Sequence, residues 1–327
     1  MRVELELNPA QRQIVDLLGA GEGDRPSFDP GLGPYLRTEL ERGLAGVAEA
    51  LGPDDDDLVV NKHGLSGVHG CEARYLAERD ERFEWTVAKA RGSIAHQAIE
   101  MGVWWKGEPV PAELVDETLA KRSTESDSLA DWLRTCTDAD RAELTGQAVE
   151  RVTTFFECFP PLKPKWRPTL EGRLRTELFG GRIVLMGKYD LSLGAAQGST
   201  AGKVIVDFKT GGFSPGHVDE MRYYALLDTL RVGTPPRLVA TYYLESGQPH
   251  PEPVSVDLLE AAVARTIDGV VRMAELAADP DLAVKRPSRV CRWCSLLDSC
   301  TEGRAHLRDD GDMDDLDAPG ADDGDDW

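Results

Sequence analysis

The stretch KVIVDFKTGG, residues 203–212, ends a run of β-branched residues with an acid and an amine, Asp207 and Lys209. Side chains alternate along a strand, so Ile205, Asp207 and Lys209 are expected on one face and the intervening valine and phenylalanine side chains on the other. A carboxylate and an ammonium on one face can serve metal and phosphate chemistry. The alternative is an exposed ion pair at a strand end, which would contribute little to stability.

A second strand, RIVLMGKYDLSL at residues 182–193, is joined to this one by the loop GAAQGSTAG. The short loop predicts an antiparallel hairpin. A turn centred between Gly198 and Ser199 places Asp190 opposite Asp207, and two like charges in that position are destabilising. A cation between them would relieve the repulsion, and hard carboxylate oxygens favour Mg²⁺ or Mn²⁺. Lys209 would then reach a phosphate oxygen or the attacking water.

Four of the six cysteines have a spacing typical of metal ligands. The segment CRWCSLLDSC places Cys291, Cys294 and Cys300 in a C-x2-C-x5-C array, and Cys71 lies 220 residues before the first of them. In a cytosolic chain of this size, cysteines serve as thiols or metal ligands more often than as a disulfide framework. Four thiolates suit a tetrahedral zinc ion by ligand type. The remaining two, Cys136 and Cys158, fit no array, and we expect them to be buried apolar groups.

The net charge of −21 is unevenly distributed. Residues 309–327 contain ten Asp and no Lys or Arg, whereas residues 160–215 contain nine Lys or Arg, Lys188 among them, and four acids. A second basic stretch covers residues 285–308. Locally the chain can therefore attract phosphate. No apolar run is long enough for a membrane span or a signal peptide, so we expect a cytoplasmic protein with no membrane partner.

The helices and strands that would position these residues are predicted from the spacing of apolar residues and from capping, glycine and proline residues at the ends of each segment. We expect helices at residues 9–18 and 34–51, a core-packed helix from about residue 86 that carries His96, and two or three helices over residues 110–158. Strands are expected at residues 169–179, 182–193, 203–210 and 237–245. Helices are expected again at residues 217–230 and 257–278. No internal repeat is present, and the acidic tail has too few apolar residues to fold.

The pair GKYD and VDFKTG resembles the GxxD and DxK signatures of PD-(D/E)xK nucleases, and specifically of the RecB-like branch. The resemblance covers residues 65–300 and implies a restriction-endonuclease-like α/β fold, a mixed central sheet flanked by helices. It also implies an upstream helical histidine, which GSIAHQAIE supplies as His96. An acid is implied in the strand before GxxD, for which Glu171 and Glu177 compete.

The resemblance extends to two further features. A downstream Gln-x-x-x-Tyr helix is matched by EMRYYALL, with Glu220 in place of Gln and with Tyr224 in register, both as nucleic-acid-binding positions together with Lys188. The arrangement of one cysteine before and three after is similar to the iron-sulfur clasp of AddB-type nucleases. That similarity implies a 4Fe-4S cluster on Cys71, Cys291, Cys294 and Cys300, with zinc as the alternative.

These features predict a divalent-metal-dependent DNA nuclease, an exonuclease acting on single strands or DNA ends in repair, recombination or defence. Its Mg²⁺ or Mn²⁺ would be held by His96, Asp190, Asp207 and an upstream glutamate, and Lys209 would orient the nucleophile. We expect a helical region over residues 1–60, the nuclease domain over residues 61–308 and a disordered tail over residues 309–327. The alternatives are a non-catalytic nucleic-acid-binding module and a subunit that works only with a helicase partner, since the chain has no phosphate loop.

Overall fold

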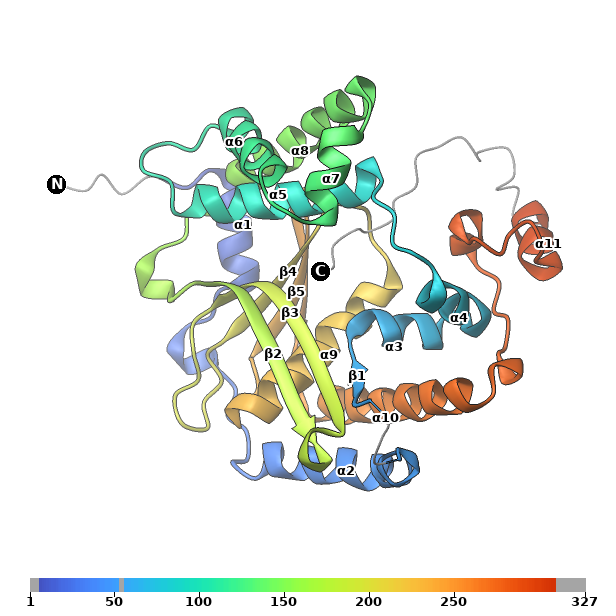
Figure 1. Cartoon of the computed structure of the whole chain (residues 1–327). Helices are drawn as coiled ribbons and strands as arrows, with labels where there is room; N and C mark the ends of the chain where they lie inside the picture. Colours follow the sequence, from blue (N-terminus) through green and yellow to red (C-terminus); the bar gives the residue numbers. More distant parts are fainter. Residues whose placement is uncertain (1–5, 53–55, 310–327) are drawn as a thin grey trace.

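Six strands form one mixed sheet in the computed structural model, which describes residues 6–52 and 56–309 of the chain (Figure 1). The order across the sheet is β1-β3-β4-β5-β6, and β2 pairs with β3. The β1–β3 and β4–β5 pairs are parallel, and the other three pairs are antiparallel. The strands are β1 (Leu58–Val60), β2 (Thr169–Leu178), β3 (Ile183–Leu193), β4 (Val204–Lys209), β5 (Leu238–Tyr243) and β6 (Gln248–Pro253). The predicted mixed sheet flanked by helices is confirmed.

The α-helices cover the sheet, and those predicted from the sequence are found within two residues of their expected bounds where bounds were specified. The described helices are α1 (Pro9–Leu18), α2 (Leu32–Ala50), α3 (Lys62–His69), α4 (Glu72–Asp80), α5 (Val87–Val103), α6 (Pro111–Ser123), α7 (Ser128–Thr135), α8 (Asp138–Cys158), α9 (Pro215–Val232), α10 (Val256–Ala278) and α11 (Thr301–Asp309). Local signals start several of them: Asn8 caps α1 ahead of a proline at the first position, and Thr86 caps α5. The sequence analysis did not find α3, α4, α11, β1 or β6.

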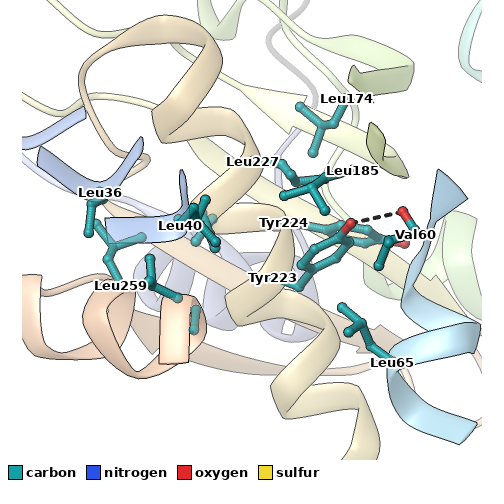
Figure 2. Close-up of a cluster of buried hydrophobic side chains, with 14 of the residues drawn as sticks. Leu36, Leu40, Val60, Leu65, Leu174, Leu185, Tyr223, Tyr224, Leu227 and Leu259 are labelled. Carbon is teal, nitrogen blue, oxygen red and sulfur yellow. Dashed lines mark hydrogen bonds between the residues drawn. The ribbon is translucent and has the colours of Figure 1, made fainter. Parts of the chain in front are cut away.

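Two hydrophobic cores pack against the sheet. The first contains leucines of α2, the inner faces of α9 and α10, and residues of β1, β2 and β3. Figure 2 shows part of it, where Tyr223 donates a hydrogen bond to the Val60 carbonyl oxygen at 3.1 Å. The second core contains α1 and α5 to α8. Strand β4 contributes to both, with Ile205 in the first core and Val206 and Phe208 in the second, which confirms the predicted alternation.

The hairpin of β3 and β4 has the predicted register. Gln197 and Thr200 exchange two backbone hydrogen bonds, 2.9 and 3.0 Å long, around a turn formed by Gly198 and Ser199. Gly198 adopts φ 60°, a left-handed conformation that glycine reaches without strain. The ladder then runs through Leu193–Val204, Ser192–Ile205 and Leu191–Val206.

One edge of strand β3 pairs with β1 at its start and with β4 at its end, and Asp190 lies just before the pairs with β4. Strand β2 pairs along nearly all of β3, while β1 pairs only with Ile183 to Leu185 and β4 only with Leu191 to Leu193. The middle of β3, residues 186–190, therefore has no ladder partner on that second edge. Tyr189 lies in the first core and Leu191 in the second, so the strand's alternation breaks at Asp190.

The predicted boundaries can be placed on this fold. Residue 60 is the last residue of β1, and α2 shares its core with α9 and α10, so the segment before residue 60 contributes to both sheet and core. The predicted acidic tail begins at Asp309, the last residue of α11, and residues 310–327 lie outside the described residues. Within the described ranges, no helix is both long enough and apolar enough to cross a membrane.

Candidate functional site

Three carboxylates lie in register on three neighbouring strands. The ladder pairs on both sides of Glu171 on β2 set it opposite Asp190 on β3. The pair Leu191–Val206 is the last one between β3 and β4, and Asp190 and Asp207 are the next residues of the two strands. Their carboxyl groups are close enough for Asp190 to raise the pKa of Asp207. Glu171, one of the two acids that compete in the sequence for the upstream position, therefore forms one row across the sheet with the two acids of the hairpin.

His96 on α5 completes this group from the second core. Its Nδ1 lies 2.9 Å from Oδ1 of Asp190, and its ring meets the ring of Phe208 edge to face at 6.0 Å. One ligand atom each from His96, Glu171 and Asp190 lie within 4.8 Å of one another, a spacing at which they could hold a metal ion. The other oxygen of Asp190, Oδ2, accepts the backbone N–H of Phe208 at 2.5 Å. This bond orients the carboxylate where the β3–β4 ladder ends.

The two candidate upstream acids have different surroundings. Glu171 has φ 55°, an uncommon conformation for a residue other than glycine, and its carboxylate is half-buried and pairs with Lys188. Glu177 lies six residues further along β2, pairs with Arg175 at 2.9 Å and is 54% exposed. Of the two, only Glu171 is grouped with His96 and Asp190.

The pKa values of the three acids shift in different directions. Desolvation raises the pKa of Asp207 to about 7, although Lys209 and Lys62 oppose the shift. Desolvation also raises the pKa of Glu171, against the effect of Lys188. For Asp190, burial favours the protonated form, but His96 and the Phe208 N–H outweigh it and leave the pKa of this carboxyl below its ordinary value. A bound cation would stabilise the ionised form of these buried acids.

Lys209 lies at the centre of a buried chain of charges. Its Nζ is 3.0 Å from Oδ2 of Asp207 and 2.9 Å from Oε2 of Glu220. The other oxygen of Glu220 lies 2.5 Å from Nζ of Lys62, a residue of α3 that the sequence analysis missed. Lys209 is 2% exposed and Asp207 3%, so the alternative of an exposed ion pair at the strand end is wrong. Glu220, expected at a nucleic-acid-binding position, here binds two lysines.

Tyr224 packs in the protein interior, and its role in binding nucleic acid stays a prediction. The side chain is fully buried in the first core (Figure 2). A Cβ at Gly187 would lie 2.9 Å from the Tyr224 ring, so the glycine of GKYD leaves room for this tyrosine. Lys188, the next residue, keeps 42% of its side chain exposed beside Glu171.

The four cysteines singled out from the sequence line one cavity of about 70 Å³, near α4 and α11. Backbone N–H groups point at two of the sulfurs, from Ser288 to Cys291 Sγ at 3.4 Å and from Gly303 to Cys300 Sγ at 3.3 Å. In the part of the chain that the structure describes, no three of these sulfurs lie within 4.8 Å of one another.

A fold of this kind with a row of acids beside a lysine is typical of metal-dependent nucleases. The family model of the PD-(D/E)XK nuclease superfamily matches residues 63–301, and the chain belongs to this superfamily. A search of curated proteins found no match to the chain.

Two solved structures are similar to the chain over most of its length. The crystal structure of SSO0001 is 12% identical, covers 82% of this chain and 96% of its own, and gives a TM-score of 0.35. That of a "putative exonuclease" from Eubacterium rectale is 13% identical, covers 75% of this chain and 86% of its own, and gives a TM-score of 0.43. Both scores are below 0.5, so neither similarity bears on function.

Proposed function

We propose that this protein is a divalent-metal-dependent DNA nuclease that acts as an exonuclease on single strands or DNA ends. Membership of a nuclease superfamily makes nucleic acid the substrate. The observation that supports hydrolysis by this chain is the row of Glu171, Asp190 and Asp207 next to a buried lysine. A non-catalytic module would have little reason to keep such a row, because burial disfavours ionised acids, as the raised pKa values of Asp207 and Glu171 indicate.

The donor set suits Mg²⁺ or Mn²⁺, since carboxylate oxygens dominate and one imidazole stands beside them. His96, Glu171, Asp190 and Asp207, with the Phe208 carbonyl, would hold the ion. A bound ion would activate water and stabilise the leaving oxygen. The chain's own residues orient the reaction: Asp190 is fixed by the Phe208 N–H at 2.5 Å, so its carboxylate cannot rotate freely.

Lys209 is proposed to neutralise charge on the scissile phosphate. Its ammonium is held between Asp207 and Glu220 at 3.0 and 2.9 Å, so it needs no reorganisation when substrate arrives. Lys188, exposed at the edge of the site, would contact the strand's backbone.

The test is cleavage of end-labelled single and double strands with Mn²⁺. Lys209→Ala should lower the rate by roughly 10² to 10³-fold, the typical effect of removing one charge-stabilising donor. Lys121→Ala removes the same charge from an exposed position on α6 and should leave the rate unchanged. An inactive parent, or a Lys209→Ala protein as active as the parent, would refute the proposal.

We also propose that Cys71, Cys291, Cys294 and Cys300 hold a 4Fe-4S cluster. Their common cavity and the N–H groups directed at two sulfurs support a metal centre. A single zinc ion, which four thiolates also suit by ligand type, is the alternative. The cytoplasmic location, the helicase partner and the role in repair, recombination or defence stay predictions.

A further inference from the structure

A cavity of about 470 Å³ lies between α3, α9 and α10, beside the row of acids. Lys209 and Glu220 belong to both the cavity wall and the buried chain of charges. The volume is within the range of small-ligand sites, roughly 300–1,000 Å³. Sequence motifs singled out two lining residues, Lys209 and Glu220, but did not predict the cavity, because its wall combines residues 62–74, 209–223, 261–266 and Val290.

The wall is cationic, in contrast to the acidic chain as a whole. Two acids line the cavity, and each of them forms ion pairs with two cationic side chains. Glu220 pairs with Lys62 and Lys209, and Asp219 lies 3.8 Å from Arg222 and 3.2 Å from Arg265. The lining residues also include Arg74, His63 and His217. The lining holds five Lys or Arg and two acids. Three of these cations also pair with acids that do not line the cavity: Arg74 with Glu78, Lys209 with Asp207 and Arg222 with Glu252. The residues that face the cavity therefore carry a net positive charge, which favours an anionic ligand.

The position of the cavity indicates which anion it takes. Lys209 follows Asp207 by two residues on β4, so the wall begins about 7 Å from the acids along the strand. A strand whose scissile phosphate lay at the acids would bring a neighbouring phosphate to this wall. Arg265, on α10, is 36% exposed and accessible to such a group.

An exposed aromatic ring lies close to the same wall. Phe213 is 60% exposed, and its ring centroid lies 5.5 Å from that of His250 and 6.2 Å from that of Tyr243. The Tyr243 hydroxyl is 3.0 Å from Nδ1 of His217, which lines the cavity. Ser214, the residue after Phe213, lines the cavity. An exposed ring beside a groove lined by cations is the arrangement with which proteins stack single-stranded bases.

We propose that this cavity is a nucleotide subsite, in which the cationic wall binds a phosphate of a single strand next to the scissile phosphate and Phe213 stacks on the attached base. The proposal rests on the proposed nuclease function and extends it to the substrate: an unpaired strand end, because a base that stacks on Phe213 is not paired with a partner.

The first test measures binding of a fluorescent single-stranded oligonucleotide in EDTA at several salt concentrations. Arg265→Gln should weaken binding several-fold and reduce the slope of log Kd against log salt by about 0.7, the contribution of one phosphate on a single strand. The matched control is Arg42→Gln on α2, where the arginine is 68% exposed and pairs with Glu39 at 2.7 Å. It should leave both the affinity and the slope unchanged.

The second test uses Phe213→Ala, an exposed substitution that leaves the charge unchanged. It should weaken single-strand binding about tenfold without changing the salt slope, and should leave duplex binding unchanged. An active parent whose Arg265→Gln and Phe213→Ala proteins bind as the parent does would refute the subsite alone. An inactive parent would refute the nuclease on which the subsite rests.

Discussion

Asp207→Asn should make the metal-free protein more stable at pH 8 than the parent, although it removes a residue of the proposed active site. Burial raises the pKa of Asp207 from 3.8 to about 7 in the folded state. Between these two values the folded state keeps a proton that the unfolded state has lost. The parent's free energy of unfolding therefore falls as the pH rises through this window. Asparagine is neutral throughout and has no such dependence.

The size of the effect follows from the shift. One pKa unit corresponds to about 1.4 kcal/mol, so a shift of about three units gives at most about 4 kcal/mol at pH 8. Part of this is already present at pH 5, and about 2–3 kcal/mol should develop between pH 5 and pH 8. The difference in free energy of unfolding between Asp207→Asn and the parent should therefore increase by about 2–3 kcal/mol from pH 5 to pH 8.

The assay is urea unfolding in EDTA at pH 5, 6, 7 and 8, with the parent and Asp207→Asn measured side by side. Asp16→Asn on α1 is the control, because that aspartate is exposed and its substitution should leave the pH dependence unchanged. Added Mg²⁺ should stabilise the parent more than the variant, since the ion binds the folded carboxylates. A stability difference that does not change with pH, or that shrinks as the pH rises, would refute the account of Asp207.

Three further substitutions test neighbouring features. Glu171→Gln should abolish cleavage while Glu177→Gln retains it, because only Glu171 is grouped with the other ligands; activity is measured on the end-labelled strand. Gly187→Ala should lower stability by about 1–3 kcal/mol in thermal unfolding, because its methyl group would meet the Tyr224 ring. Cys71→Ser should yield a colourless protein that trypsin cuts more readily, whereas the parent should be brown with broad absorbance near ~400 nm.

Each of these has an outcome that contradicts it. Equal activity of the two glutamine variants would remove Glu171 from the site. Gly146→Ala on α8 is the control for Gly187, since no atom lies within 4 Å of the added Cβ, and an equal effect of both changes would show that Tyr224 packing is not the cause. A colourless parent with one zinc ion per chain would replace the cluster by zinc and leave the hairpin unaffected.

Much of the hairpin could be predicted from the sequence because its signals are local. A two-residue turn at Gly198 and Ser199 and the alternation of β4 together determine the register, and the structure has the same register. The positions of Asp190 beside Asp207 and of Lys209 on the same face follow from these two features alone. The main helices were predictable for a similar reason, since caps and apolar periodicity act within a few residues.

The elements that the sequence did not reveal are short or depend on distant partners. Strand β1 has three residues and is stabilised by pairing with β3, 125 positions away. Strand β6, QPHPEP, has three prolines, a composition that argues against a strand when it is read alone, and it pairs only with β5. Local propensity carries no information about such pairings.

The sequence by itself therefore determined the acids, the lysine and their hairpin, whereas tertiary packing decided which of the other residues join them. His96 reaches Asp190 because α5 packs on the second core, and Lys62 reaches Glu220 because α3 packs beside α9. Tyr224 shares a motif with Glu220 yet is fully buried. Residues on one helix diverge in this way because burial depends on what packs against each face, and that partner comes from a distant part of the chain.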